Sequence, residues 1–241
     1  MNAYEICLSG GASIPLANHH MLQAMIYNII THNGDDISFF HDTGYKTENG
    51  RKFKLFCFSS LRGKKIIADR KIIFEDKIYL DVRSISDDFC TYFEKGLEGN
   101  STVTLGEQEL SIKTLRKVQS PVLKASVVVQ MLSPITVYAS TDSESYYFSP
   151  IENDFSIAVN NNFQNKYKAY YGYAPDGNIH LSSLQVLTKD KYVTHFKNTM
   201  ITAWRGVYLL KGSPEHIQFL YYTGLGGKNS AGFGLWSPVE L

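Results

Sequence analysis

The amino-acid sequence predicts an α+β fold made of two consecutive βαββαβ units. Short runs rich in β-branched and aromatic residues alternate with amphipathic helical segments in the first half, and a similar order follows in the second. Residues 118–123, which contain a Ser-Pro pair, separate the two orders and are typical of a linker. The 241 residues, 44% of them hydrophobic, suffice for a core in each half. We therefore predict one domain at residues 1–117 and another at 124–241.

Four strands and a small hairpin are expected in the first half. The strands are residues 3–8, 52–59, 78–83 and a segment near 111–113, with the hairpin between 64 and 74.

Three helices are expected between these strands. The first follows Asn18, a residue type that caps helices, and runs to about residue 31 because its apolar residues share one face. A short helix begins near residue 35 or 36 and ends by Gly44, and a third covers residues 87–97 and ends by Gly99. Strands and helices in this order form the split βαβ pattern of a ferredoxin-like (RRM-like) domain.

A similar order is expected in the second half. The predicted elements are a strand at 125–130, a helix at 151–170, strands at 179–187 and 200–210, a helix capped by Ser213 with Pro214 at its first position, and a last strand at 233–236.

Composition narrows the class of protein. The chain has 24 basic and 23 acidic side chains, so it is neither a charged disordered protein nor an acidic tail. The three cysteines lack CxxC spacing and predict neither a disulfide framework nor a thiolate metal site. No stretch has the length and apolarity of a membrane helix, and the N-terminal segment lacks the features of a signal peptide. We expect a cytoplasmic protein with no cofactor, no metal and no membrane partner.

Basic side chains are unevenly distributed along the chain. Residues 46–77 contain ten Lys or Arg against four Asp or Glu, and residues 113–124 carry four more basic side chains with no acidic one among them. Summed positive charge attracts phosphate backbones, and the 16 Tyr and 14 Phe include candidates to stack on unpaired bases. A solvated surface and aromatic packing in strands are the alternative explanations. Composition is therefore compatible with RNA binding and does not establish it.

The most specific local pattern is the glycine-rich segment 224–234, Gly-Leu-Gly-Gly-Lys-Asn-Ser-Ala-Gly-Phe-Gly. It does not fit a Walker loop, because Tyr222 occupies the position of the first glycine and Asn229 that of the Ser or Thr. It does not fit a dinucleotide fingerprint, because no helix follows it. Glycines at this density allow two backbones to approach closely and leave N–H groups for phosphate oxygens. The alternative is a flexible hairpin turn.

This segment resembles the C-terminal glycine-rich signature of the CRISPR-associated endoribonucleases that cut precursor CRISPR RNA within its repeats, members of the RAMP superfamily. Short blocks in the same order along the chain are also similar to motifs of that family. They are Ile14-Pro15, residues 22–28, Phe40-His41, residues 54–59, residues 132–135 and residues 202–204. The resemblance implies two ferredoxin-like domains and metal-independent cleavage. In that reaction the RNA 2′-hydroxyl attacks the adjacent phosphate and leaves a 2′,3′-cyclic phosphate (or 3′-phosphate) and a 5′-hydroxyl.

The family pattern assigns catalysis to a Tyr, a His and a Lys, which match Tyr27, His41 and Lys54 in this sequence. Tyr27 lies opposite the apolar face of the first predicted helix, so we do not expect it to pack in the core. An imidazole suits proton transfer at neutral pH, and a lysine would stabilise charge on the phosphorane. Lys46 or Lys52 in place of Lys54, and His20 in place of His41, remain open, and His19 is a further candidate.

The partner that the resemblance implies is CRISPR repeat RNA. Candidate contacts are Gly226, Lys228, Asn229 and Ser230 in the glycine segment and the basic residues Arg51, Lys52, Arg62, Lys64 and Lys65. A homodimer and association with a CRISPR effector complex stay open.

Two other functions are alternatives to the endoribonuclease. A non-catalytic RAMP-type subunit that holds crRNA in an effector complex has similar domains and needs no Tyr, His and Lys set. A small-molecule enzyme on a ferredoxin-like scaffold is disfavoured, because both nucleotide-loop templates fail.

Overall fold

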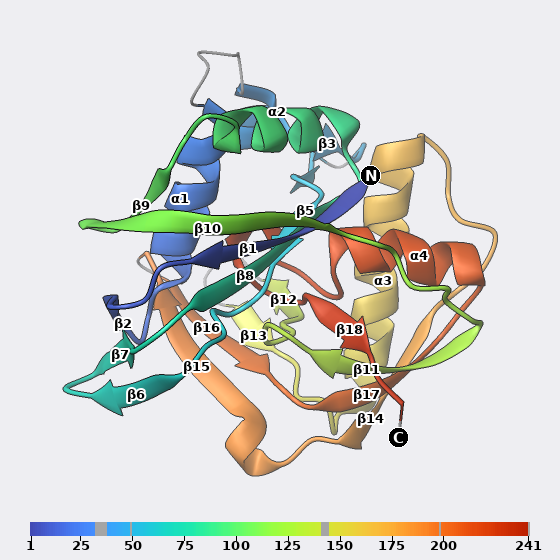
Figure 1. The fold of residues 1–241 in the computed structure, drawn as a ribbon. Coiled ribbons are helices and arrows are strands. Elements are labelled where there is room, and N and C mark those ends of the chain that lie inside the picture. The colour runs from blue at the N-terminus through green and yellow to red at the C-terminus, as the bar shows by residue number, and fades with distance from the viewer. Residues whose placement is uncertain (32–37, 49, 141–144, 198, 241) are drawn as a thin grey trace.

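The N-terminal half is built on a five-stranded antiparallel sheet in the order β5-β8-β1-β10-β9 (Figure 1). The computed structural model describes residues 1–31, 38–48, 50–140, 145–197 and 199–240, and of residue 41 the backbone alone. The strands are β1 (Asn2–Leu8), β5 (Phe56–Phe58), β8 (Ile78–Ser84), β9 (Thr102–Leu105) and β10 (Gln108–Val118). The helices α1 (His19–Thr31) and α2 (Asp87–Leu97) cover one face. Tyr4, Ile6 and Leu8 of β1 alternate toward these helices, as the two-residue period of a strand requires.

The C-terminal half repeats this topology. Its sheet has the order β14-β17-β11-β18, and its helices are α3 and α4. The bounds are β11 (Ser126–Met131), α3 (Asn153–Tyr171), β14 (His180–Gln185), β17 (Val207–Lys211), α4 (Pro214–Thr223) and β18 (Trp236–Pro238). In each half the first strand lies between the third and the fourth, and the second lies beside the third. This is the ferredoxin-like order, so the predicted tandem fold is confirmed.

Smaller elements complete the fold. They are the sheet of β2 (Ser13–Pro15), β7 (Lys71–Phe74) and β6 (Lys65–Ala68), the pairs β3 (Tyr45–Lys46) with β4 (Lys52–Phe53), β12 (Tyr138–Ser140) with β13 (Ser145–Tyr147) and β15 (Lys191–Phe196) with β16 (Thr199–Trp204), and the short helices η1 (Phe39–Thr43), η2 (Thr188–Asp190) and η3 (Asn229–Ala231). The sequence did not predict β2, β3, β9, β12, β13 or β15. No helix in the described part of the chain has the length and apolarity needed to cross a membrane.

The helices agree closely with the sequence predictions. Ser86 and Ser213 cap α2 and α4 through their hydroxyls, and Pro214 occupies the first turn of α4. Asn18 precedes α1 as expected, but its side chain donates to the carbonyls of Pro15 and Leu16. The predicted start of the short second helix lies outside the described residues, and the described part is the single π-helical turn η1, which ends before Gly44.

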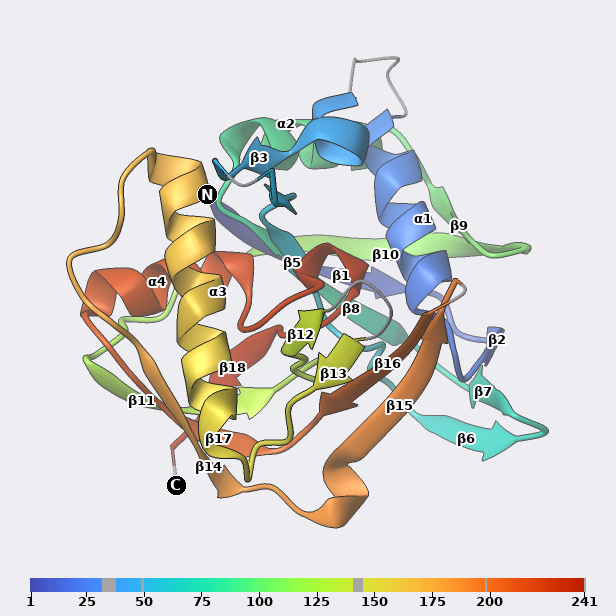
Figure 2. The same ribbon diagram turned by 180° about the vertical axis from the view of Figure 1, so that it is seen from behind.

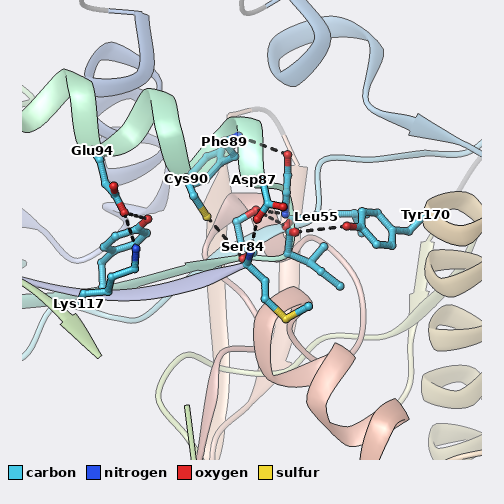
Figure 3. Close-up of polar contacts among 12 residues, drawn as sticks. Leu55, Ser84, Asp87, Phe89, Cys90, Glu94, Lys117 and Tyr170 are labelled. Atoms are coloured by element: carbon cyan, nitrogen blue, oxygen red, sulfur yellow. Dashed lines mark hydrogen bonds and ion pairs between the residues drawn. The ribbon is translucent and has the colours of Figure 1, made fainter. Parts of the chain in front are cut away.

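Two predicted strands are wrong in their continuity. The segment 52–59 is divided into β4 and β5 by Leu55, which has a positive φ of 52°. The Ser84 hydroxyl donates to the Leu55 carbonyl at 2.8 Å and stabilises this break (Figure 3). The segment 200–210 is divided into β16 and β17 by Gly206, at φ 118°, where a Cβ would lie 2.7 Å from the carbonyl oxygen of Gln185. Both breaks depend on contacts with distant segments, which a local pattern does not contain.

The two halves share a hydrophobic cluster. One large cluster lies within the N-terminal half, and a second contains Ala3, Leu55 and Ile85 of the first half among residues of the second. Tyr170 of α3 donates from its hydroxyl to the carbonyl of Ile85, as Figure 3 shows. The proposed domain boundary at residues 118–123 stays a prediction. Residues before and after it contact each other across the two halves.

Arg83 of β8 is a buried charged group at this contact, with 5% of its surface exposed. Its guanidinium donates to the carbonyl of Trp236 at 2.7 Å and lies 3.8 Å from the ring centroid of Tyr221. A charge in this position joins β8 to α4 and β18, which belong to the other half.

We predict that Arg83→Met lowers the free energy of unfolding by about 2 kcal/mol, because it removes a charge-assisted hydrogen bond and leaves a buried carbonyl unpaired. Urea denaturation followed by tryptophan fluorescence measures this change. Arg116→Met is the matched control, since Arg116 pairs with Glu5 while 67% of its side chain is exposed, and it should cost less than about 1 kcal/mol. Equal effects of the two substitutions would contradict the assignment.

Candidate active site

The glycine-rich loop, residues 224–234, connects α4 to β18 and packs against β5 and α1 of the other half. A Cβ at Gly232 would lie 2.5 Å from the ring of Phe58 and 2.7 Å from that of His19, and one at Gly234 would overlap the carbonyl of Leu225. The predicted close approach of backbones is therefore confirmed, and side chains at these positions would break the contact.

The expectation that the loop leaves its N–H groups for phosphate is wrong for many of them. The amides of residues 224, 225, 227, 231, 232 and 234 donate to protein carbonyls. Gly227 donates to Thr136 at 2.8 Å, and Gly234 to Pro134 at 2.9 Å. These bonds fix the loop to the segment before β12. The loop is thus a packed structural element rather than an open cradle of amides.

Two buried polar side chains hold the loop from within. The amine of Lys166, on α3, donates to the carbonyl of Gly224 at 2.5 Å, to Asn229 Oδ1 at 3.1 Å and to the carbonyl of Gly226 at 3.4 Å. Asn229 in turn donates from Nδ2 to the carbonyls of Leu225 and Phe233, each at 3.0 Å. Burial lowers the pKa of Lys166 from 10.5 to about 7. Asn229, predicted to contact RNA, uses its side chain to shape the loop.

A cavity of about 210 Å³ lies between this loop and residues 51–55. Its walls bring together six predicted site residues and six others from both halves. They are Arg51, Lys52, Lys54, Lys228, Asn229 and Ser230, with Phe53, Leu55, Tyr138, Asn162, Lys166 and Gly227. Gly226, also predicted, is buried beneath it, where its carbonyl accepts from Lys166. The cavity is strongly basic, which suits a phosphate group.

Lys54 lies at the break between β4 and β5, next to Leu55 with its positive φ. Its Nζ is buried and has no hydrogen-bond partner among the described residues. Burial lowers the pKa of Lys54, Asp42 opposes this effect and Lys52 adds to it. A desolvated amine beside a basic cavity is arranged to meet an anion. Lys52 instead donates to the carbonyl of Asp42 at 3.0 Å, and Lys46 is exposed on β3.

One face of α1 points at the loop and at η1. Residues 19, 23 and 27, each one turn apart, carry this face. Gln23 donates to the carbonyl of Ser230 at 2.7 Å, and Tyr27 donates from its hydroxyl to the carbonyl of Phe40 at 3.2 Å. The expectation that Tyr27 avoids the core is wrong, since its half-buried ring packs edge-on against Phe56. Burial, followed by the charge of Asp42, raises the pKa of Tyr27 to about 12, so the phenol holds its proton at neutral pH.

The backbone of His41 lies in η1, between the Phe40 carbonyl bonded by Tyr27 and the Asp42 carbonyl bonded by Lys52. Its side chain is outside the part of the chain that the structure describes. The structure therefore brings Tyr27, the backbone of His41 and the basic segment 51–54 together, and the position of the imidazole stays a prediction.

The other two candidate histidines differ from each other. His20 is exposed on α1. His19 is buried and stacks on Phe233 with ring centroids 4.5 Å apart, and its Nδ1 lies 3.0 Å from the carbonyl oxygen of Ala231. Burial lowers the pKa of His19 to about 4, so its ring is neutral at neutral pH. His19 packs the loop onto α1.

The basic residues near the β6–β7 hairpin lie outside this cavity. Arg62 pairs with Glu5 at 3.1 Å and Asp81 at 2.8 Å, and Lys64 pairs with Glu75 at 2.7 Å. Lys65 donates to the carbonyl of Leu61 at 3.3 Å and lines a separate cavity of about 380 Å³ with Arg70 and Arg205. Contacts of these three predicted residues with phosphate stay predictions.

Sequence reasoning missed Asn162 and Lys166, one turn apart on α3. The Asn162 amide, oriented to satisfy both neighbours, donates to the carbonyl of Gly226 at 2.6 Å and accepts from Arg51 Nη2 at 3.1 Å. It therefore links the glycine loop to the basic segment 51–54 of the other half. Only their four-residue spacing on one helix could have suggested that these polar side chains act together. Among the described residues, no cluster of three or more His, Cys, Asp or Glu is arranged to hold a metal ion.

We predict that the pKa of Lys166 makes stability depend on pH. The unfolded chain binds this proton up to about pH 10.5 and the folded chain only to about 7, so unfolding free energy rises with pH between these values. In Lys166→Met this part of the rise should be absent in urea titrations between about pH 7 and pH 9. Lys168→Met, two residues further on and paired with Glu48, should keep it. A rise unchanged in Lys166→Met would contradict the assignment.

Comparison with known proteins points to one family. Residues 117–238 match the family described as CRISPR associated protein Cas6, C-terminal. The chain is 27% identical to CRISPR-associated endoribonuclease Cas6 1 of Methanocaldococcus jannaschii over 94% of this chain and 88% of that one. A structure from a Cas6-related gene of Pyrococcus furiosus covers 99% of this chain and 98% of its own with a TM-score of 0.86 at 19% identity.

A further solved structure, described as a RAMP protein binding different RNA substrates, covers 100% of both chains with a TM-score of 0.85 at 18% identity. These structural matches share the tandem ferredoxin-like fold found here. The family match spans the glycine-rich loop and the helix α3 that holds it. The chain therefore belongs to the Cas6 family.

Proposed function

We propose that this chain is an endoribonuclease that cleaves precursor CRISPR RNA within its repeats. The observation that carries the proposal is the buried amine of Lys54, which faces a basic cavity between the two halves in a chain of the Cas6 family. Relatives named as CRISPR-associated endoribonucleases support the activity, and a structural relative described as binding RNA supports the substrate class.

In the proposed reaction the RNA supplies its own nucleophile. The 2′-oxygen bonds to the adjacent phosphorus and loses its proton, while the bond to the 5′-oxygen breaks and that oxygen gains a proton. The products carry a 2′,3′-cyclic phosphate and a 5′-hydroxyl, and no metal ion takes part; addition of water to the cyclic phosphate gives the 3′-phosphate. The required groups are a base, an acid and a cation beside the phosphorane.

The residues of the site divide these tasks. Lys54 stabilises the negative phosphorane from within the cavity. His41 takes the proton from the 2′-hydroxyl and, as an imidazolium, returns a proton to the leaving 5′-oxygen, because an imidazole exchanges protons near neutral pH. Tyr27 holds its proton, since its pKa is raised to about 12, and it therefore acts as a hydrogen-bond donor rather than as a base. Arg51, Lys52 and Lys228 bind neighbouring phosphates at the rim of the cavity.

We predict that cleavage of repeat RNA continues in EDTA and stops when the scissile nucleotide carries a 2′-deoxy sugar. His41→Ala should lower the single-turnover rate by about 10²–10⁴-fold with little change in affinity, because a positioned acid or base contributes that much. Gel analysis of labelled RNA measures both. His20→Ala, on the exposed face of α1, is the control and should retain the rate. Loss of cleavage in EDTA, or full activity of His41→Ala, would contradict the mechanism.

We predict that Lys54→Ala lowers the cleavage rate by about 10²-fold or more, since it removes the cation beside the phosphorane. The same substitution should not unfold the chain, because it removes a buried amine that lacks a partner among the described residues. Lys95→Ala, on the exposed side of α2, provides the matched control. A fully active Lys54→Ala would transfer the role to Lys52 or Lys46.

Intact RNA that the wild-type chain nevertheless binds tightly would indicate the alternative function, a non-catalytic RAMP-type subunit that holds crRNA. A homodimer, association with an effector complex and a cytoplasmic location are further expectations. Light scattering of the chain with and without repeat RNA tests the first of these.

A further inference from the structure

A second cavity, of about 340 Å³, lies directly beside the Lys54 cavity. The two share four lining residues, which are Arg51, Tyr138, Asn162 and Gly227. An RNA strand whose phosphate lies in the Lys54 cavity can therefore place the neighbouring nucleotide in the second cavity.

The two walls of this second cavity come from elements that lie side by side in Figure 2, α3 and the β12–β13 pair. Along α3 the lining positions are 154, 157, 158, 161 and 162, which is one helical face. The facing wall consists of residues 137–139 and Phe148. Ile157 is a large apolar side chain with 57% of its surface exposed here. A soluble helix would ordinarily have a polar residue at such a position.

The facing wall holds a preset aromatic ring. Lys228 lies with its Nζ 4.7 Å from the ring centroid of Tyr138, and Tyr147 lies 5.5 Å away on the same hairpin. These contacts restrain the Tyr138 ring before any ligand arrives. An aromatic ring held beside an open cavity is a stacking surface.

The polar groups lie around these apolar walls. Asn161 is exposed at one side, and Asp154 lies about two turns before it on the same face of α3. The Arg51 guanidinium is held by Asn162 at the border with the Lys54 cavity. Amide and carboxylate groups recognise the edge of a nucleobase, while aromatic and aliphatic side chains contact its faces. A phosphate would avoid the apolar walls and the carboxylate of Asp154. A purely apolar ligand would leave the amides and the guanidinium unpaired.

We propose that this cavity binds an unpaired nucleobase of the RNA, from the nucleotide next to the phosphate held at Lys54. The inference rests on the proposed function, because it takes the RNA path from the Lys54 cavity. The base enters between α3 and β12, Arg51 contacts the phosphate between the two cavities, and Asn161 reads the edge of the base. The site thereby fixes which phosphate reaches Lys54, and it adds a sequence preference at one flanking position.

A coupling experiment tests this site. Repeat RNAs with a 2′-deoxy scissile nucleotide carry a single abasic residue at each flanking position in turn, and dissociation constants are measured for wild-type chain and for Ile157→Ala/Asn161→Ala. In the wild type, one abasic position beside the scissile phosphate should weaken binding by about 5- to 100-fold, the usual worth of a stacked base. The double variant should bind intact RNA more weakly than the wild type does. Removing the base at that position should then raise its dissociation constant little further.

Asn165→Ala is the matched control, because Asn165 lies one turn beyond Asn161 on α3 and does not line the cavity. It should keep the wild-type dependence on every position. Cleavage of all-ribose repeat RNA by the wild type is measured in parallel. If cleavage occurs but the abasic penalty is the same in the double variant, or no flanking position shows one, the base site is disproved and the proposed function stands. If the wild type neither cleaves nor binds repeat RNA, both fall.

Discussion

Close packing of the glycine-rich loop is the constraint on which the rest of this structure depends. The loop belongs to the C-terminal half, yet its Gly232 lies so close to Phe58 and His19 of the N-terminal half that no side chain would fit there. Backbone bonds to Pro134 and Thr136 fix its other side. A loop so confined adopts one shape, and that shape determines the wall of the cavity opposite Lys54.

The loop is held by charge as well as by contact. Lys166 supplies a buried amine to three oxygens of the loop, and Asn162 joins Gly226 to Arg51. Burying an amine is costly unless its hydrogen bonds are made, so these oxygens and α3 specify each other's positions. On the opposite side, the positive φ of Leu55 breaks the strand next to Lys54, and Lys54 lines the same cavity. Each half thus provides one wall, and neither half contains the site alone.

Much of the fold could be predicted from the sequence, because periodicity and caps are local signals. The helices α2 and α4, with Ser86 and Ser213 at their starts, are where the pattern placed them, and the tandem topology follows from the order of elements. The break at Leu55 could not be predicted, since a non-glycine residue at positive φ is stabilised there by the distant Ser84. The short strands β12 and β13 carry too few residues to show a period.

The location of the site could be predicted from the sequence, but the hydrogen-bond partners of its residues could not. The glycine pattern and the resemblance located the glycine loop and the basic segment 51–54, which the structure brings together around one cavity. They also suggested Asn229 as an RNA contact, although that side chain is committed to the loop, and they gave no reason to notice Lys166. Whether a polar residue faces solvent, RNA or a buried carbonyl depends on the tertiary fold, which residue type alone does not encode.

The most direct test of this account is a crystal structure of the chain with repeat RNA blocked by a 2′-deoxy sugar at the scissile nucleotide. The account predicts the scissile phosphate in the cavity between residues 51–55 and the glycine loop, within hydrogen-bond distance of Lys54 Nζ, with the glycine loop unchanged. A scissile phosphate bound on another surface, with Lys54 still enclosed and distant from the RNA, would contradict it.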